Sequence, residues 1–151
     1  MNAHGSLLMH TPGSHRVSLD TLRSFPDPVA LGPRHKPIPH HVLVDELQDQ
    51  VTGRGWMVRK RDLGVARKGH ALFGVMDLLG PETNDDTGTT LGFRSSTNSA
   101  FAIRGVAGAR VFVCDNLCFS GDEFVMRHKL TTLLNLPALV SGALDKFTLQ
   151  N

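Results

Sequence analysis

The sequence predicts an α+β domain, in which an N-terminal arm and a helix precede an antiparallel meander of about five strands and two C-terminal helices. Three observations favour this class. Leu43, Leu47 and Val51 recur at helical spacing, which indicates an early helix. Two apolar runs flank residues 67–69 in the way that strands flank a hairpin turn. After Gly121 the apolar period becomes helical again.

The first segment, residues 1–36, is rich in His, Ser, Pro and Gly, and we expect an extended or partly disordered arm there. Its prolines fix φ and remove backbone donors, which disfavours a long helix. The piece VSLDTLRSF within the arm is expected to add a turn of helix or to dock on the body. Residues 37–151 are predicted to form a single α+β domain.

The first helix of the domain is expected over His40–Thr52. Pro39 suits a first helical turn, because its missing amide is not needed there. Gly53 and Gly55 supply the left-handed residues that end helices, so the helix should stop before the next strand.

Two strands, Trp56–Val65 and Ala71–Leu79, are expected to form a hairpin after this helix. The second strand is apolar on both faces, which indicates a central position in the sheet. An exposed loop is expected over residues 80–88. Shorter strands are then expected at Thr89–Phe93, Ala100–Arg104 and Ala109–Cys114.

Two C-terminal helices complete the expected order. Acidic residues are favoured at a helix N-terminus, so the first of these helices should begin at Asp122 and Glu123. Asn135 is expected to cap the second. Nothing after this helix would cover its apolar side, which predicts a partner or oligomer interface. The interface residues would be Leu136, Val140, Leu144 and Phe147.

Composition limits the classes of function. With 151 residues, of which 40% are hydrophobic and 20% charged, the chain is expected to bury one sizeable core. It has neither the pattern of a signal peptide nor an apolar run of about 18 residues. We therefore expect a soluble protein of the host cell cytoplasm, with both of its cysteines reduced.

Charge is unevenly distributed, although the formal net charge is only +2. The expected hairpin is basic, and the loop at residues 80–88 that follows it is acidic. We predict that the hairpin binds nucleic acid, with Arg94 in support and Trp56 packing or stacking on bases. Its phosphate-binding cations would be Arg59, Lys60, Arg61, Arg67 and Lys68. The alternative is a solvated sheet edge that charge protects from aggregation.

The pattern does not favour a metal or catalytic centre. The ligand types of a zinc site are present, but no second paired cluster of cysteines accompanies them. A nucleophilic cysteine is also poorly supported, because the carboxylate that follows Cys114 would raise the pKa of its thiol. The residues considered as zinc ligands are His40, His41, Cys114, Cys118 and His128. Because neither kind of site is supported, we expect no metal, no cofactor and no catalytic residue.

The loop Arg94–Ser99 is a candidate anion site, because hydroxyls and backbone amides behind an arginine can cradle a phosphate. The alternative is a polar connection between two strands. No glycine-rich motif ending in Gly-Lys-Ser accompanies the loop, so ATP hydrolysis is not indicated.

The motif Val-Phe-Val-Cys-Asp-Asn at residues 111–116, preceded by an Arg-Ser-Ser loop, resembles the phage and plasmid family called domain of unknown function 932. The resemblance covers roughly residues 40–130 and implies a mobile-element origin with no established activity. Ser95, Thr97 and Asn98 stand where that family has Asn, His and Asp. The order of elements is also similar to that of single-strand annealing proteins, which form rings and bind DNA in a basic groove.

We therefore expect a non-enzymatic phage or plasmid protein that binds nucleic acid, with single-stranded DNA favoured. It is expected to form a homo-oligomer of annealing type and to act in recombination. The alternative is a small inhibitor of a host defence system, similar to anti-CRISPR proteins, that binds a host protein complex. This alternative rests on the altered residues of the Arg94–Ser99 loop and on the apolar side of the last helix. It also rests on the acidic residues between Glu82 and Asp86, which would imitate nucleic acid.

Overall fold

The computed structural model describes residues 6–8, 13–80, 89–98, 102–108, 112–114, 122–126, 132 and 135–145. No helix in this part of the chain is long and apolar enough to cross a membrane. In chain order, the elements are β1 (Ser6–Leu8), β2 (His15–Val17), α1 (Leu19–Arg23), α2 (His40–Gly53), β3 (Met57–Ala66), β4 (Ala71–Leu79), β5 (Thr89–Ser96), β6 (Ile103–Gly108), β7 (Phe112–Cys114), β8 (Asp122–Met126) and α4 (Leu136–Asp145).

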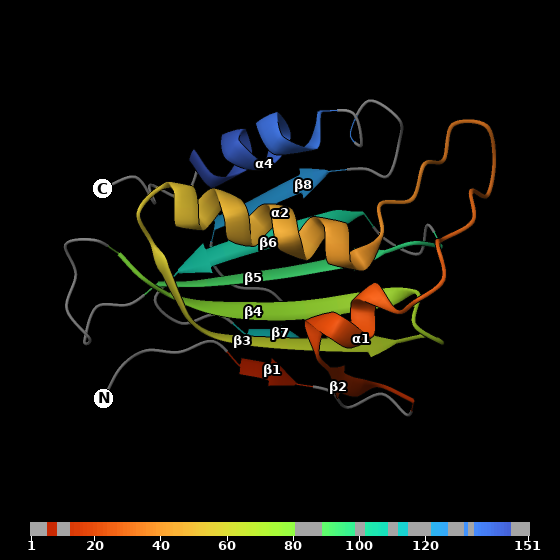
Figure 1. Ribbon diagram of the computed structural model, residues 1–151, viewed down its shortest axis with the longest axis horizontal. Helices are drawn as coiled ribbons and strands as arrows, with labels where there is room; N and C mark the ends of the chain where they lie inside the picture. The colour runs from red at the N-terminus through yellow and green to blue at the C-terminus, as the bar shows by residue number, and fades with distance from the viewer. Residues whose placement is uncertain are drawn as a thin grey trace.

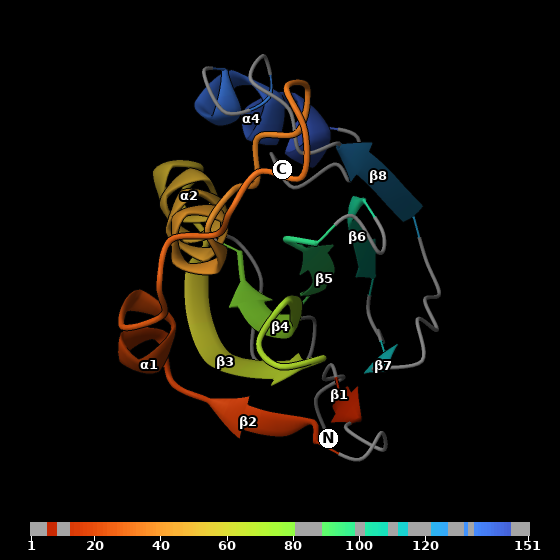
Figure 2. The ribbon, with the colours of Figure 1, turned by 90° about the vertical axis from the view of Figure 1, so that its right-hand side faces the viewer.

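The main sheet is six-stranded, with every neighbouring pair antiparallel, in the order β2-β3-β4-β5-β6-β8. β1 and β7 form a separate parallel pair. Helices α1, α2 and α4 lie on one side of the main sheet and the β1–β7 pair on the other (Figure 1, Figure 2). The predicted α+β class and antiparallel meander are therefore confirmed.

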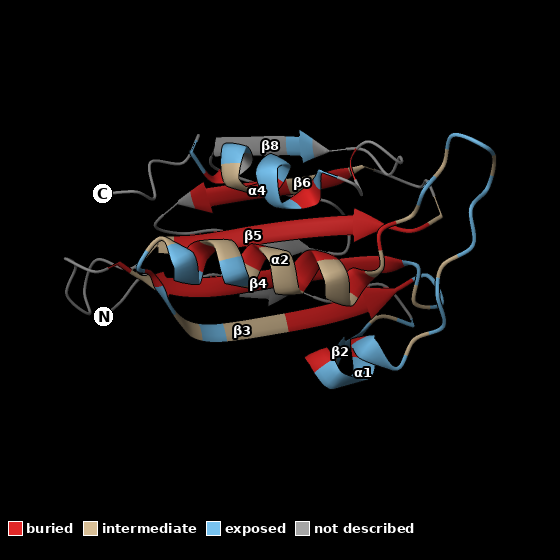
Figure 3. Cartoon of the chain, turned by 45° about the horizontal axis from the view of Figure 1, so that its top comes forward, coloured by how far each residue is buried: buried red, intermediate tan, exposed pale blue. Residues whose placement is uncertain are grey.

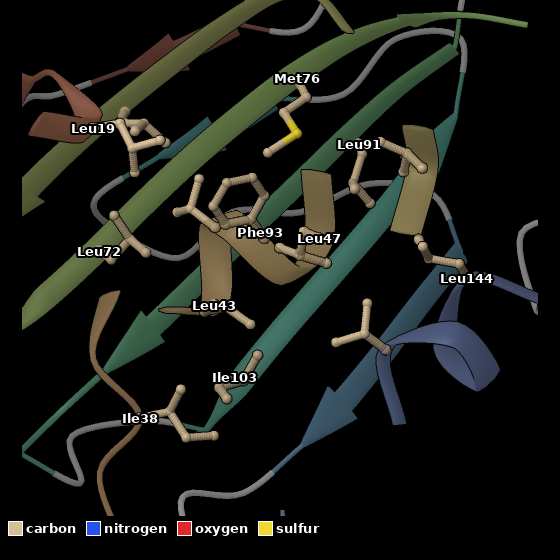
Figure 4. Close-up of a cluster of buried hydrophobic side chains, with 14 of the residues drawn as sticks. Leu19, Ile38, Leu43, Leu47, Leu72, Met76, Leu91, Phe93, Ile103 and Leu144 are labelled. Atoms are coloured by element: carbon tan, nitrogen blue, oxygen red, sulfur yellow. The ribbon is translucent and has the colours of Figure 1, made fainter. Parts of the chain in front are cut away.

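The predicted central position of β4 is also confirmed, because it pairs with β3 on one side and β5 on the other. Residues 71–78 of this strand are all buried, and Figure 3 shows the burial continuing across β5. The main core lies between the sheet and the helices. Figure 4 shows Leu47 of α2 in this cluster with Met76, Leu91 and Phe93 of the sheet.

Gly74 allows the Phe93 ring to lie directly over β4. The two residues are partners in the β4–β5 register. A Cβ atom at position 74 would lie 2.6 Å from Phe93 Cε2 and 3.0 Å from Leu63 Cδ2. Phe93 is 0% exposed and Leu63 is 3% exposed, so neither side chain has room to move away. This position therefore requires glycine.

α2 ends in a Schellman motif, which confirms the prediction for Gly55 but not for Gly53, because Gly53 is the last residue of the helix and has no positive φ. The Trp56 amide donates to the Val51 carbonyl at 3.1 Å, and the Gly55 amide donates to the Thr52 carbonyl at 3.0 Å. Gly55 has the positive φ, 87°, that this motif needs. Trp56 and Val51 form the apolar pair of the motif, and both belong to the core.

The apolar side of α4 is packed inside the chain, which corrects its prediction as a partner or oligomer interface. α4 packs against α2, where Arg54 donates to the Ser141 carbonyl at 2.6 Å and pairs with Asp145 at 2.7 Å. The helical period predicted the apolar side correctly, but it could not show that α4 packs against α2, which lies far away in the sequence. Phe147 lies outside the described residues. The other predicted interface residues are 0–3% exposed: Leu136, Val140 and Leu144.

Two predictions about the C-terminal half are wrong. Asp122–Met126 forms β8 instead of beginning a helix, and Glu123 lies opposite Val106 of β6. Adjacent acids are a weak helix signal where an unpaired sheet edge is available for a strand. The strand expected at Ala109–Cys114 is shorter, and it pairs with β1 instead of joining the meander.

Part of the predicted arm belongs to the folded domain. β2 pairs with β3, and Ser18 caps α1 by accepting a hydrogen bond from the Thr21 amide at 3.1 Å. Leu19 and Leu22 of α1 enter the core. The expectation that VSLDTLRSF adds a turn of helix and docks on the body is confirmed.

Candidate nucleic-acid interface

The predicted basic hairpin is formed by β3 and β4, and its cations fall into two groups. We call Arg59, Lys60 and Arg61 the hairpin body, because they lie within β3. We call Arg67 and Lys68 the hairpin tip, because they lie in the turn between the strands. The two groups have different surroundings.

In the hairpin body, Lys60 is exposed like the tip cations, but both Lys60 and Arg61 contact another side chain. Lys60 Nζ lies 3.6 Å from Asp62 Oδ2 on the same strand. Arg61 donates to the side-chain oxygen of Gln48 on α2. The register is irregular immediately before Lys60, which places Arg59 at a β-bulge. Because of this bulge, strict alternation along the strand does not place Arg59 and Arg61 on the same face.

At the hairpin tip, the backbone is left-handed over three successive residues. Arg67, Lys68 and Gly69 have φ angles of 54°, 58° and 87°. The Gly69 amide donates to the Ala66 carbonyl, and the His70 amide to the Arg67 carbonyl, each at 3.1 Å. This conformation costs a non-glycine residue roughly 1–2 kcal/mol, and such turns usually contain Asn or Gly. Here both strained residues are exposed cations.

Neighbouring elements hold the tip in place. His40 Nε2, at the start of α2, donates to the Gly69 carbonyl at 2.8 Å. The Phe25 ring lies over Gly69, with Cε2 3.2 Å from where a Cβ atom would be, and meets the His40 ring edge-on. On the β5 side, the Thr97 amide donates to the His70 carbonyl at 2.9 Å. The tip is therefore supported from both sides.

His40 makes this contact as a neutral side chain. Burial lowers its pKa from 6.5 to about 4, against the opposing effect of the hydrogen bond to Gly69, and nearby His70 and His41 lower it further. Because Nε2 donates to a carbonyl, Nδ1 is an unprotonated acceptor. It is buried and has no hydrogen-bond partner within the described part of the chain.

A pocket of about 390 Å³ lies beside the tip. The turn between β3 and β4, which forms the tip, is at the end of the molecule that faces the viewer in Figure 2. One side of the pocket is formed by α1 and its connection to α2, and the other by the tip and the end of β5. An adjoining hollow of about 430 Å³ adds Lys36 to this surface. The main pocket is lined by Leu22, Phe25, Pro26, Asp27, Pro28, Val29, Leu31, Pro39, His40, His41, Lys68, Gly69, His70, Thr97 and Asn98.

The structure corrects two members of the predicted site. Trp56 is 6% exposed and its ring packs over Gly80, so this side chain packs and does not stack on bases. Arg94 is also 6% exposed, because β5 continues to Ser96 where a loop was expected. It lies opposite Arg104 on β6, on the sheet face away from Phe93 and the helices.

Sequence reasoning missed the residues that support the tip. Phe25 comes from the predicted arm, and His40 was considered only as a metal ligand. The signal available was the Pro-Ile-Pro-His-His run at residues 37–41, which places two histidines at a helix start. Nothing in the sequence indicated that this start meets Gly69, far along the chain.

No group of three or more His, Cys, Asp or Glu side chains in the described part of the chain is arranged to hold a metal ion. Cys118 and His128 lie outside that part, as do the acidic residues between Glu82 and Asp86. Comparison with protein-family models, with curated proteins and with solved structures found no match for this chain. The resemblance at residues 111–116 therefore stays a prediction.

Proposed function

We propose that this protein binds single-stranded nucleic acid through the hairpin tip, without catalysing a reaction. The observation that carries the proposal is the placement of two exposed cations, Arg67 and Lys68, in left-handed backbone. Asn or Gly would form this turn at lower free-energy cost. Cations held there despite the strain indicate a function for their charge.

The surroundings of the tip support nucleic acid as its anionic partner. The tip adjoins a pocket that combines apolar and aromatic side chains with Lys68 and histidines. Cations that follow a phosphate backbone, next to surfaces that accept bases, are typical of single-strand binding. Lys36, across the adjoining hollow, extends the positive charge beyond the tip.

The alternative, an inhibitor of a host defence system, has lost one of its supports. The apolar side of α4 on which it relied is buried against α2 and the sheet. Another support, the acidic segment between Glu82 and Asp86, lies outside the described residues. Mobile-element origin and assembly of annealing type are further parts of the proposal, and they rest on the sequence resemblances alone. Cytoplasmic location is also proposed, and it rests on the composition of the sequence.

The test compares two double variants that lose the same net charge. The tip variant is Arg67→Asn with Lys68→Asn, because Asn tolerates a left-handed backbone. The body variant is Arg59→Gln with Lys60→Gln. Fluorescence anisotropy would measure binding to a labelled single strand of about 20 nucleotides in about 50 mM salt.

The tip variant is expected to bind at least about tenfold more weakly than the unmodified protein, because each lost phosphate contact removes counterion release. The body variant should bind as the unmodified protein does. Circular dichroism would check that both variants are folded. Equal losses in the two variants would overturn the assignment to the tip, and a wild-type protein that binds no strand would overturn the function.

A further inference from the structure

We infer that the pocket beside the hairpin tip holds one unstacked nucleotide of the bound strand, with its base against the apolar wall and its phosphate toward Lys68. This inference rests on the proposed function and specifies the ligand of the same site. The pocket joins Phe25 and Leu31, from the connection after α1, to Lys68, His70 and Thr97, from the tip and β5.

The two walls of the pocket match the two chemical parts of a nucleotide. The connection contributes aromatic, leucine, valine and proline side chains, which favour a flat apolar ring. The opposite wall contributes the Lys68 ammonium group, the His70 ring and the Thr97 hydroxyl, which favour an anion. The last two groups are already positioned together, since His70 Nδ1 lies 3.2 Å from Thr97 Oγ1.

The other polar groups of the lining agree with this orientation. Asp27 belongs to the connection, so a phosphate on that side would be repelled while a base amino group would find an acceptor. Base amino and imino groups are donors of the kind that a carboxylate such as that of Asp27 pairs with. His40 also lines the pocket, but it is 5% exposed and its Nδ1 is buried.

The size of the pocket fits one nucleotide and not a duplex. Its volume of about 390 Å³ lies within the roughly 300–1,000 Å³ of typical small-molecule sites. A base can enter only when it is unstacked, which a single strand allows at low cost. The same geometry therefore favours single strands over duplexes.

The test compares a cytosine homopolymer of about 20 nucleotides with an abasic strand of the same length and charge. The unmodified protein should bind the intact strand about tenfold more tightly, since each stacked base contributes on that scale. Leu31→Ser, which removes an exposed part of the apolar wall, should lower this ratio by about threefold. Leu139→Ser on α4, an exposed leucine outside the pocket, should leave the ratio unchanged.

The ratio separates the two proposals. If intact and abasic strands bind equally, and both depend on Arg67 and Lys68, the nucleotide pocket is refuted while the proposed function stands. If neither strand binds, the proposed function itself fails. A ratio that falls equally in Leu31→Ser and Leu139→Ser would also refute the pocket, because the effect would then be unspecific.

Discussion

The body and the tip of the β3–β4 hairpin contain the same kinds of residue but differ in what surrounds them. Lys60 and Arg61 in the body contact Asp62 and Gln48 within the chain. At the tip, Arg67 and Lys68 are exposed beside a pocket, on a strained turn. Cation density in a sequence therefore does not show which cations lie on a strained turn beside a pocket, and it is to those cations that we assign binding.

The difference extends to how each part is held. The body is fixed by the sheet and by packing such as that of Phe93 over Gly74. The tip is held by the hydrogen bond from His40 to Gly69 and by the Phe25 ring. We therefore expect binding to depend on the cations of the tip and not on those of the body, whereas both parts of the hairpin contribute to global stability.

The largest expected effect is on stability, from a substitution beside the hairpin body. Gly74→Ala should lower the free energy of unfolding by about 3 kcal/mol, because the new methyl group would overlap the buried Phe93 ring. Chemical denaturation followed by circular dichroism would measure it. The control is Gly142→Ala on α4, where a Cβ atom meets nothing within 4 Å and helix propensity should stabilise by about 1 kcal/mol. Equal stabilities for the two variants would contradict the packing described for β4.

The next effect is a pH dependence that arises at the tip. The pKa of His40 is about 4 in the folded protein and near 6.5 in the unfolded chain, so the unfolded chain takes up the proton first as pH falls. The contribution of His40 to stability is therefore complete above pH 6.5 and is lost progressively toward pH 4. The total loss should be about 3 kcal/mol.

His40→Gln isolates this effect, because glutamine keeps an N–H donor for the Gly69 carbonyl but does not titrate. Urea unfolding of both proteins at several pH values would give the difference in their stabilities. That difference should change across the window between pH 6.5 and 4 and be constant above it. Parallel stability curves would show that His40 is not buried as a neutral group.

The smallest expected effect is the change in the free energy of unfolding when a lysine of the hairpin is replaced by glycine. Its sign should differ between the tip and the body. Lys68→Gly should raise the free energy of unfolding by about 1 kcal/mol, because glycine removes the left-handed strain. Lys60→Gly should lower it by about 1 kcal/mol, because glycine weakens a strand interior. Thermal denaturation of the two variants would show the signs. A loss of stability in both variants would mean that the tip is not strained.

Much of the fold could be predicted from local patterns. The spacing of Leu43, Leu47 and Val51 indicated α2, and the apolar faces of residues 71–79 indicated a central strand. The segment at Asp122–Met126 could not be predicted, because its pairing with β6 depends on contacts distant in sequence. Local signals predict an element well where its apolar periodicity is strong. They predict it poorly where pairing with a sheet edge determines whether the segment forms a strand or a helix.

The candidate site was predictable only in part, for the same reason. Arg67 and Lys68 were identified by their charge and their place in a turn. Phe25 and His40 were missed as supports, because chain topology alone brings them to Gly69. Arg94 was misplaced because a polar sequence resembled a loop although it lies in a buried strand.

The most direct test of the central claim is the salt dependence of single-strand binding. The slope of log Kd against log salt concentration counts the phosphates that the protein neutralises. The tip variant, Arg67→Asn with Lys68→Asn, should reduce this slope by about 1.4, at about 0.7 for each phosphate. The body variant, Arg59→Gln with Lys60→Gln, should leave the slope unchanged. A slope that changes with the body variant and not with the tip variant would contradict the account.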